Sequence, residues 1–109
     1  MQHELYNALN DVDFPKINRI LRAHPRLWSV TGCGGDSIAQ IAAYYNCHET
    51  METLTLVHRN AASHTGWGNP IHPSLNAAQR GHLELFHYMV RRGKVNVEAC
   101  IRSLSNYPA

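Results

Sequence analysis

A hydrophobic run long enough to cross a membrane, roughly 18 apolar residues, is absent from this sequence of 109 residues. Its first stretch, MQHELYNALNDVDF, carries acidic side chains and no long apolar core, so we do not expect it to act as a secretory signal. Cysteine is also scarce, and Cys33, Cys47 and Cys100 lack the even number and the spacing of a disulfide framework. These absences predict a soluble, cytoplasmic protein without a membrane partner.

A large excess of one charge sign is missing as well. Ten basic and eight acidic side chains give a formal net charge of +2, and they are scattered along the chain. The side chains that could contact phosphate groups are few and are not interleaved with aromatic residues: Arg80, Arg91, Arg92, Lys94 and Arg102. We expect them to form a solvated face, so the sequence does not predict a nucleic-acid partner.

Motifs for metal binding, catalysis or phosphate binding are not found either. The eight histidines and three cysteines form no His-x3-His and no Cys-x2-Cys pair. Cys47 and His48 are adjacent, and adjacent helical residues point about 100° apart, which prevents a simple hydrogen bond between nucleophile and base. The glycine cluster at residues 32–35 has no Lys-Ser or Lys-Thr pair after it and indicates a flexible turn. We predict no enzyme activity, no metal site and no cofactor; a metal-dependent activity of the His and Cys residues is the alternative from another functional class.

The sequence does contain a globular composition and an internal repeat. Its 44% of hydrophobic and 17% of charged residues indicate a folded chain, and its length fits one domain. Residues 42–49 align with residues 77–84 at an offset of 35, the difference 78 − 43 between Ala78 and Ala43. A further step of 35 places Ala43 on Ala8, provided that one extra residue is allowed before Asp13.

Each repeat has the pattern of two short helices joined by a tight turn. Gly81 can adopt the left-handed conformation that ends a helix without a Cβ clash. After it, Leu83, Phe86 and Val90 have the i, i+3, i+7 spacing of one apolar helix face. We expect Gly93 to end this second helix in the same way. The repeat therefore predicts an all-α chain of helix-turn-helix units.

The unit at residues 77–99, AAQRGHLELFHYMVRRGKVNVEA, resembles the ankyrin repeat nearly position by position. The unit at 35–54 is similar, although Ser-Ile-Ala-Gln at 37–40 stands where the family has Thr-Pro-Leu-His, and 72–75 keeps only the proline of that motif. The resemblance implies an ankyrin-type solenoid that forms a single domain, 1–109, with units at about 4–30, 35–65 and 70–99 and a capping segment at 100–109. A helical bundle outside this family is the structural alternative.

The resemblance also implies a function, because the turns and first helices of ankyrin-type stacks line a concave surface that usually binds another protein. The family's contact positions fall on these residues: Cys33, Gly34, Asp36, Tyr44 and Tyr45, then Gly68, Asn69, Ile71, Gln79 and Arg80. Trp67, in the loop sequence GWG, is a further candidate, either as an interface anchor or as a lid over the core. Tyrosine and arginine are favoured anchors of protein interfaces, although either tyrosine could instead pack between helices.

The predicted function is therefore that of a protein–protein interaction module, whose partner the sequence does not name. One alternative is an effector that inhibits a host or target protein through the same surface, which would place it in the host-cell cytosol. At the carboxyl end, Cys100, Ile101 and Leu104 could form a helical turn that covers the third unit. If that apolar face were left uncovered, the chain would self-associate as a homo-oligomer or belong to a larger parent protein.

Overall fold

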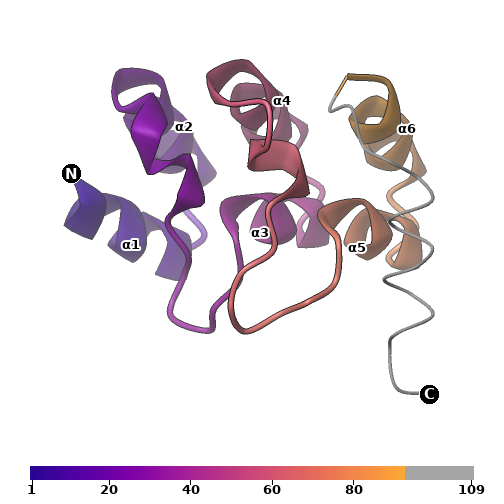
Figure 1. The fold of residues 1–109 in the computed structure, drawn as a ribbon, viewed down its shortest axis with the longest axis horizontal. Coiled ribbons are helices and arrows are strands. Elements are labelled where there is room, and N and C mark those ends of the chain that lie inside the picture. Colours follow the sequence, from indigo (N-terminus) through magenta and orange to yellow (C-terminus); the bar gives the residue numbers. More distant parts are fainter. Residues whose placement is uncertain (93–109) are drawn as a thin grey trace.

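The computed structural model describes residues 1–92, and this part of the chain is all-α, as the repeat predicts (Figure 1). Its helices are α1 (Gln2–Asn10), α2 (Phe14–Ala23), α3 (Ile38–Tyr44), α4 (His48–Val57), α5 (Pro73–Gln79) and α6 (Leu83–Arg92), with short 3-10 helices η1 (Pro25–Ser29) and η2 (Ala61–Ser63). Within these residues the only β-pairing is an isolated bridge between Thr31 and Ser37. The expected roles of Gly93 and of the segment 100–109 lie outside the described residues.

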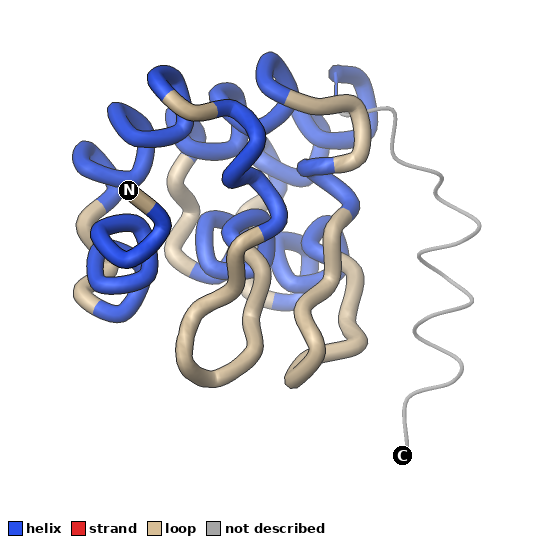
Figure 2. Tube along the Cα trace, turned by 60° about the vertical axis from the view of Figure 1, so that its left-hand side comes forward, coloured by secondary structure: helices blue, strands red, loops and turns tan. Residues whose placement is uncertain are grey.

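The helices form two rows with two long loops on one side. The first helix of each pair, α1, α3 and α5, lies in one row, and α2, α4 and α6 lie in the other (Figure 1). The loops that lead into α3 and α5 project beside the first row (Figure 2). The two helices of each pair pack together, and between pairs α3 packs on α5, α2 on α4 and α4 on α6, which is the arrangement expected of a helical repeat. None of the helices in 1–92 has the length and hydropathy needed to cross a bilayer.

The helix boundaries confirm the offset of 35 residues between the second and third helix pairs and correct the offset between the first and second. From the second pair to the third, α3 to α5 and α4 to α6, both ends of each helix move by 35 residues, as 73 − 38 and 92 − 57 show. From the first pair to the second the step is 34, since α2 begins at 14 and α4 at 48. Ala8 therefore corresponds to Ala42, and no extra residue is needed before Asp13.

The turn between the two helices of a pair is the same in all three pairs. One residue takes a left-handed conformation in each: Val12 at φ 53°, Asn46 at φ 58° and Gly81 at φ 77°. The amide that follows it donates to a carbonyl five residues earlier, for example His82 to Ala77 at 2.8 Å. This is the Schellman pattern that closes a helix. The expected role of Gly81 is confirmed, whereas Val12 is a β-branched residue in a conformation that it rarely adopts.

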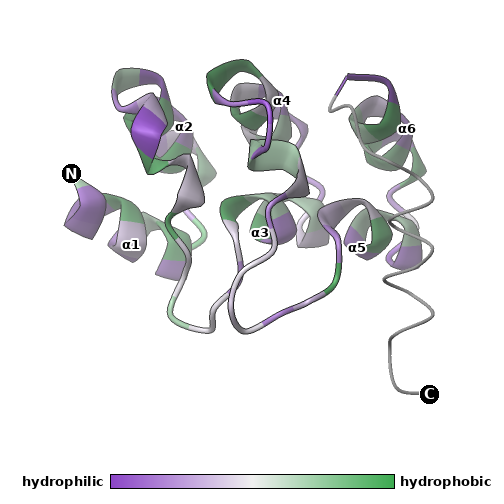
Figure 3. Cartoon of the chain, viewed as in Figure 1, coloured by the Kyte–Doolittle hydropathy of each residue, from purple (hydrophilic) through white to green (hydrophobic). Residues whose placement is uncertain are grey.

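The core runs without interruption between the two rows. Hydrophobic and hydrophilic stretches alternate along the helices (Figure 3), and the largest fully buried apolar side chains come from five of them: Leu5, Ile17, Leu21, Ile38, Met51, Leu54, Leu85 and Met89. From α5, Leu75 and Ala77 complete the cluster. The small side chains of Ala8, Ala42 and Ala77, at equivalent positions of the three pairs, allow the helices to approach closely.

The apolar face predicted for α6 is shifted. Leu83 is 58% exposed, whereas Leu85 and Met89, spaced i, i+4, are fully buried. Phe86 and Val90 are half-buried at the edge of this face. Leu83 is the first residue of α6, so its side chain lies beyond the contact that the helix makes with α5 and α4.

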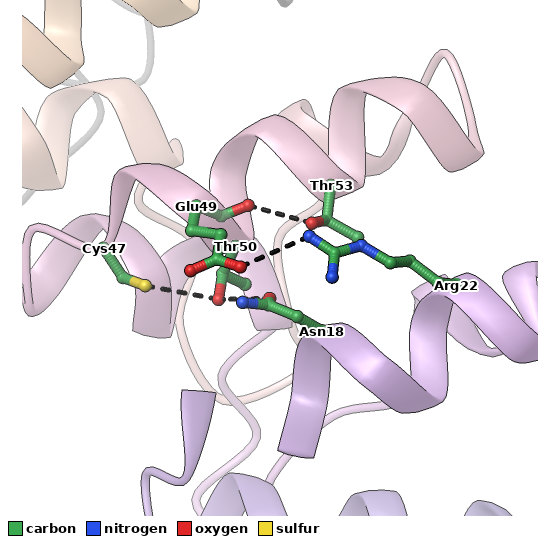
Figure 4. Close-up of polar contacts among 6 residues, drawn as sticks. All are labelled: Asn18, Arg22, Cys47, Glu49, Thr50 and Thr53. Carbon is green, nitrogen blue, oxygen red and sulfur yellow. Dashed lines mark hydrogen bonds and ion pairs between the residues drawn. The ribbon is translucent and has the colours of Figure 1, made fainter. Parts of the chain in front are cut away.

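A polar cluster joins α2 to α4 (Figure 4). The Thr50 hydroxyl donates to Asn18 Oδ1 at 2.6 Å in the core and accepts from the Cys47 thiol at 3.3 Å. On the surface nearby, Arg22 and Glu49 form an ion pair at 3.3 Å. The Cys47 thiol donates a hydrogen bond to the Thr50 hydroxyl, so this cysteine has a structural partner within the cluster.

Candidate functional site

Two loops meet at a junction that only glycine allows. The first loop, 30–37, leads into α3, and the second, 64–72, leads into α5; the Gly68 amide donates to the Gly35 carbonyl at 3.0 Å. A Cβ on Gly66 would lie 1.7 Å from the Gly35 oxygen, and Gly35 itself has φ +83°. We call Gly35, Gly66 and Gly68 the loop junction. The turn predicted at residues 32–35 is present, and at its buried end, Gly35, two backbones are in close contact.

Gln40 holds the two loops together from inside. This side chain is 2% exposed. Its Oε1 accepts from the amides of Ser37 at 2.8 Å and Gly66 at 3.0 Å, while its Nε2 donates to the carbonyls of Asn69 at 2.8 Å and Ile71 at 2.7 Å. Two donors and two acceptors are all that a glutamine amide offers, so the group is fully satisfied. Ser37 completes a capping box with Gln40 and also donates to the His64 carbonyl of the second loop.

Asp36 and Asn69 connect the loops at the surface. The Asn69 Nδ2 donates to Asp36 Oδ1 at 3.1 Å, and Asn69 Oδ1 accepts from the Ile71 amide at 3.0 Å. The two side chains belong to different repeat units but are fixed relative to one another. The carboxylate of Asp36 is thereby held in place before any partner arrives.

A hollow of about 320 Å³ lies between α3 and α5, beside this connection. We call it the α3–α5 hollow, and its walls are Asp36, Gln40, Ile41, Tyr44, Tyr45, Asn69 and Asn76. Gln40 and Tyr44 are spaced four residues apart, so they lie on one face of α3, and Asp36 lies in the loop two residues before that helix begins. One carboxylate, three amides and two phenol rings thus share one concave surface.

Both tyrosines are exposed, so neither packs between helices. Tyr44 is 44% and Tyr45 54% exposed, and their rings meet edge-on with centroids 4.9 Å apart. The Arg80 guanidinium lies over the Tyr44 ring, 3.7 Å from its centroid. Phe14 approaches Tyr45 edge-on at 6.1 Å. These contacts restrict the rotamers of the two rings while leaving much of their surface open to a partner.

Trp67 is not a lid over the core. Its side chain is 78% exposed on the second loop, next to the junction at Gly35. Of the two alternatives for Trp67, the interface anchor stays a prediction.

The remaining predicted positions lie outside the hollow. Cys33, Gly34 and Gly68 are exposed on the loops and Gln79 is exposed at the end of α5, whereas Ile71 is half-buried and packs against the core. The Cys33 amide donates to Asn10 Oδ1 at 3.1 Å, which ties it to the first unit. Of the eleven predicted positions, the structure gathers Asp36, Tyr44, Tyr45 and Asn69 in the hollow, with Arg80 against its rim.

Sequence reasoning missed three members of the hollow: Gln40, Ile41 and Asn76. Ile41 and Asn76 are separated by 35 residues, as 76 − 41 shows, and hence occupy the same position in adjacent units. The repeat was therefore the signal for this pair. Gln40 stands where the ankyrin family has histidine, and its contacts span 26 to 31 residues along the chain, which no local pattern indicates.

Three of the histidines, His64, His72 and His82, make contacts within the fold. The His82 ring contacts the Tyr44 carbonyl of the preceding unit at 3.2 Å. His72 caps α5 by accepting from the Ser74 amide at 3.0 Å, and burial lowers the pKa of His72. Burial also lowers the pKa of His64, whose ring lies edge-on to Trp28 at 5.3 Å. Within residues 1–92, no group of three or more His, Cys, Asp or Glu side chains is placed to hold a metal ion.

Comparison with protein-family models, with curated proteins and with solved structures finds no match for this chain. The ankyrin-type interpretation therefore depends on the residues themselves and on the helical repeat described above.

Proposed function

We propose that this protein is a small ankyrin-type module that binds a partner protein through the surface formed by α3, α5 and the two loops. The repeat supports this interpretation: three helix pairs spaced by 34 and 35 residues share one turn conformation. Long loops beside the row of first helices are a further feature of such stacks (Figure 2).

The observation that carries the proposal is the exposed pair Tyr44 and Tyr45 with Arg80 stacked on it. Tyrosine and arginine are enriched among the residues that dominate binding energies, because each buries a large area when a partner covers it. Here the rings lie next to a hollow whose loops are already fixed by Gln40 and Asn69. A surface that is ordered before binding loses less conformational entropy on association.

The test is affinity capture with three forms of the protein and identification of retained proteins by mass spectrometry. We expect a partner from extracts of the source cells to be retained by the wild type and lost by the Tyr44→Ala/Tyr45→Ala double variant. Loss of two anchors costs about 2 kcal/mol or more, roughly 30-fold in Kd. Leu56→Ala is the matched control, because Leu56 is 80% exposed on α4, in the other helix row.

Circular dichroism accompanies the capture. Both tyrosines are exposed, so helix content is expected to be the same in all three forms. Equal recovery of every protein by the wild type, the double variant and the control would refute the proposal.

A further inference from the structure

The α3–α5 hollow combines a negative charge with aromatic walls. Asp36 accepts a hydrogen bond at Oδ1 from Asn69, and within residues 1–92 no Lys, Arg or His nitrogen lies within ion-pair distance of its carboxylate. Tyr44 and Tyr45 line the same hollow. A carboxylate beside aromatic rings attracts a cation, because both the charge and the ring quadrupole are favourable to it.

The size of the hollow limits what it can hold. Its volume of about 320 Å³ is at the lower end of the range of roughly 300–1,000 Å³ found for small-molecule pockets. This space suits one long side chain better than an entire small ligand. The partner inferred above would then supply that side chain.

Two features favour a guanidinium over an ammonium. The chain's own Arg80 already stacks on Tyr44 at 3.7 Å, which shows that this ring accepts a planar guanidinium. Asn76, on α5, lines the opposite wall of the hollow, and its side-chain amide includes an acceptor oxygen. A guanidinium has five donors in a fork that can reach a carboxylate and an amide together, whereas an ammonium is more strongly hydrated. Arg80 also sets the orientation of the inserted side chain, because the positive charge of Arg80 at Tyr44 repels a second cation toward Asp36.

We propose that the partner protein inserts an arginine side chain into the α3–α5 hollow, pairs its guanidinium with Asp36 and rests its stem on the tyrosine pair. This inference rests on the proposed function and names the chemistry that the surface recognises. It predicts that the partner carries an exposed arginine that cannot be replaced by a neutral residue of the same shape.

The experiment is a titration of the protein with N-acetyl-arginine amide, followed by NMR of the side-chain amides of Asn69, Asn76 and Gln40. A ligand of this size binds in the millimolar range at best. We expect saturable shifts at Asn69 and Asn76, and a response at least tenfold weaker to N-acetyl-citrulline amide, which has the same shape but no charge. N-acetyl-lysine amide is expected to bind more weakly than the arginine compound.

Two variants complete the titration. Asp36→Asn keeps an acceptor for Asn69 and removes the charge, and we expect it to weaken arginine binding at least tenfold. Glu52→Gln, at an exposed position of α4, removes the same charge elsewhere and is expected to leave binding unchanged. No shifts with arginine, equal shifts with citrulline, or full binding by Asp36→Asn would each overturn the inference, and an equal response to lysine would overturn the assignment of a guanidinium.

The failure of this inference can be told apart from failure of the proposed function. If Asp36→Asn still captures the partner while the double tyrosine variant does not, the proposed binding surface is supported and the inference of an inserted arginine is wrong. If neither substitution affects capture, the surface itself is wrong.

Discussion

The helix–helix turns and the loop junction place opposite demands on the sequence. Three different residues, Val12, Asn46 and Gly81, hold the same left-handed position in the turns, and a Cβ added at Gly81 would meet nothing within 4 Å. In the junction, a Cβ on Gly66 would lie 1.7 Å from a backbone oxygen. A side chain at a turn therefore meets only the strain of its left-handed backbone, whereas a side chain in the junction also collides with the neighbouring unit. The junction is also the region that positions the α3–α5 hollow.

Among the substitutions that test this comparison, Gly66→Ala is expected to have the largest effect on stability. The added methyl group collides with backbone and not with a movable side chain, so the loops must separate, and we expect a loss of about 3 kcal/mol or more in unfolding free energy. The control is Gly34→Ala on the neighbouring loop, where the nearest atom is Asp36 Oδ2 at 3.8 Å. Urea denaturation of the two variants checks the expectation, and equal midpoints would mean that the junction is not closed in solution.

The second-largest loss of stability is expected for Gln40→Leu, which keeps the bulk of the side chain and removes its amide. Two amide groups and two carbonyls lose their partner at once, and we expect a cost of about 2–3 kcal/mol, part of which is recovered as the loops admit water. Hydrogen exchange locates the effect: the amides of Ser37 and Gly66 should exchange faster, while α1 and α2 keep their protection. Unchanged exchange at Gly66 would contradict the role given to Gln40.

The turns offer a smaller and reciprocal test. Gly81→Val imposes on the third turn the residue type that the first already carries, at a cost of about 1–2 kcal/mol for a left-handed branched residue. Val12→Gly removes that strain, and we expect a gain of up to about 1 kcal/mol, reduced by the lost packing of a half-buried side chain. Thermal melts of both variants are the measurement. A lower Tm for Val12→Gly would show that Val12 contributes more by packing than it loses by strain.

Lowering the pH gives the mildest perturbation of the junction, since two partly buried histidines, His64 and His72, lie at the two ends of the second loop. Burial lowers the pKa of His64 and His72, so the folded state favours their neutral forms. Stability is thus full above pH 6.5, the ordinary histidine pKa, and declines as the pH falls toward the lower pKa of the folded state. His72→Asn keeps a residue that can cap α5 and should make the decline shallower, whereas His3→Asn at an exposed site is the control. Parallel declines in all three proteins would show that other groups cause it.

Much of the fold followed from local patterns, and most of the junction did not. The repeat located both helices of the second and third pairs, and Gly81 marked its turn because glycine is the residue most suited to a left-handed conformation. The left-handed conformation of Val12 was not predicted, because a β-branched residue is the least expected at such a position. Gln40 escaped because its partners lie on a loop 26 to 31 residues away. The tyrosine pair was identified from the contact positions that the ankyrin resemblance implies and from residue type, but only the structure shows that both rings are exposed.

The central claim is that a partner protein covers the tyrosine surface, and site-specific photocrosslinking in the source cells tests it most directly. Benzoylphenylalanine is introduced at Tyr45 in one form of the protein and at Leu56, on the other helix row, in a second. The account predicts that irradiation yields a discrete adduct with one protein from position 45 and none from position 56. No adduct at position 45, or the same adducts from both positions, would contradict it.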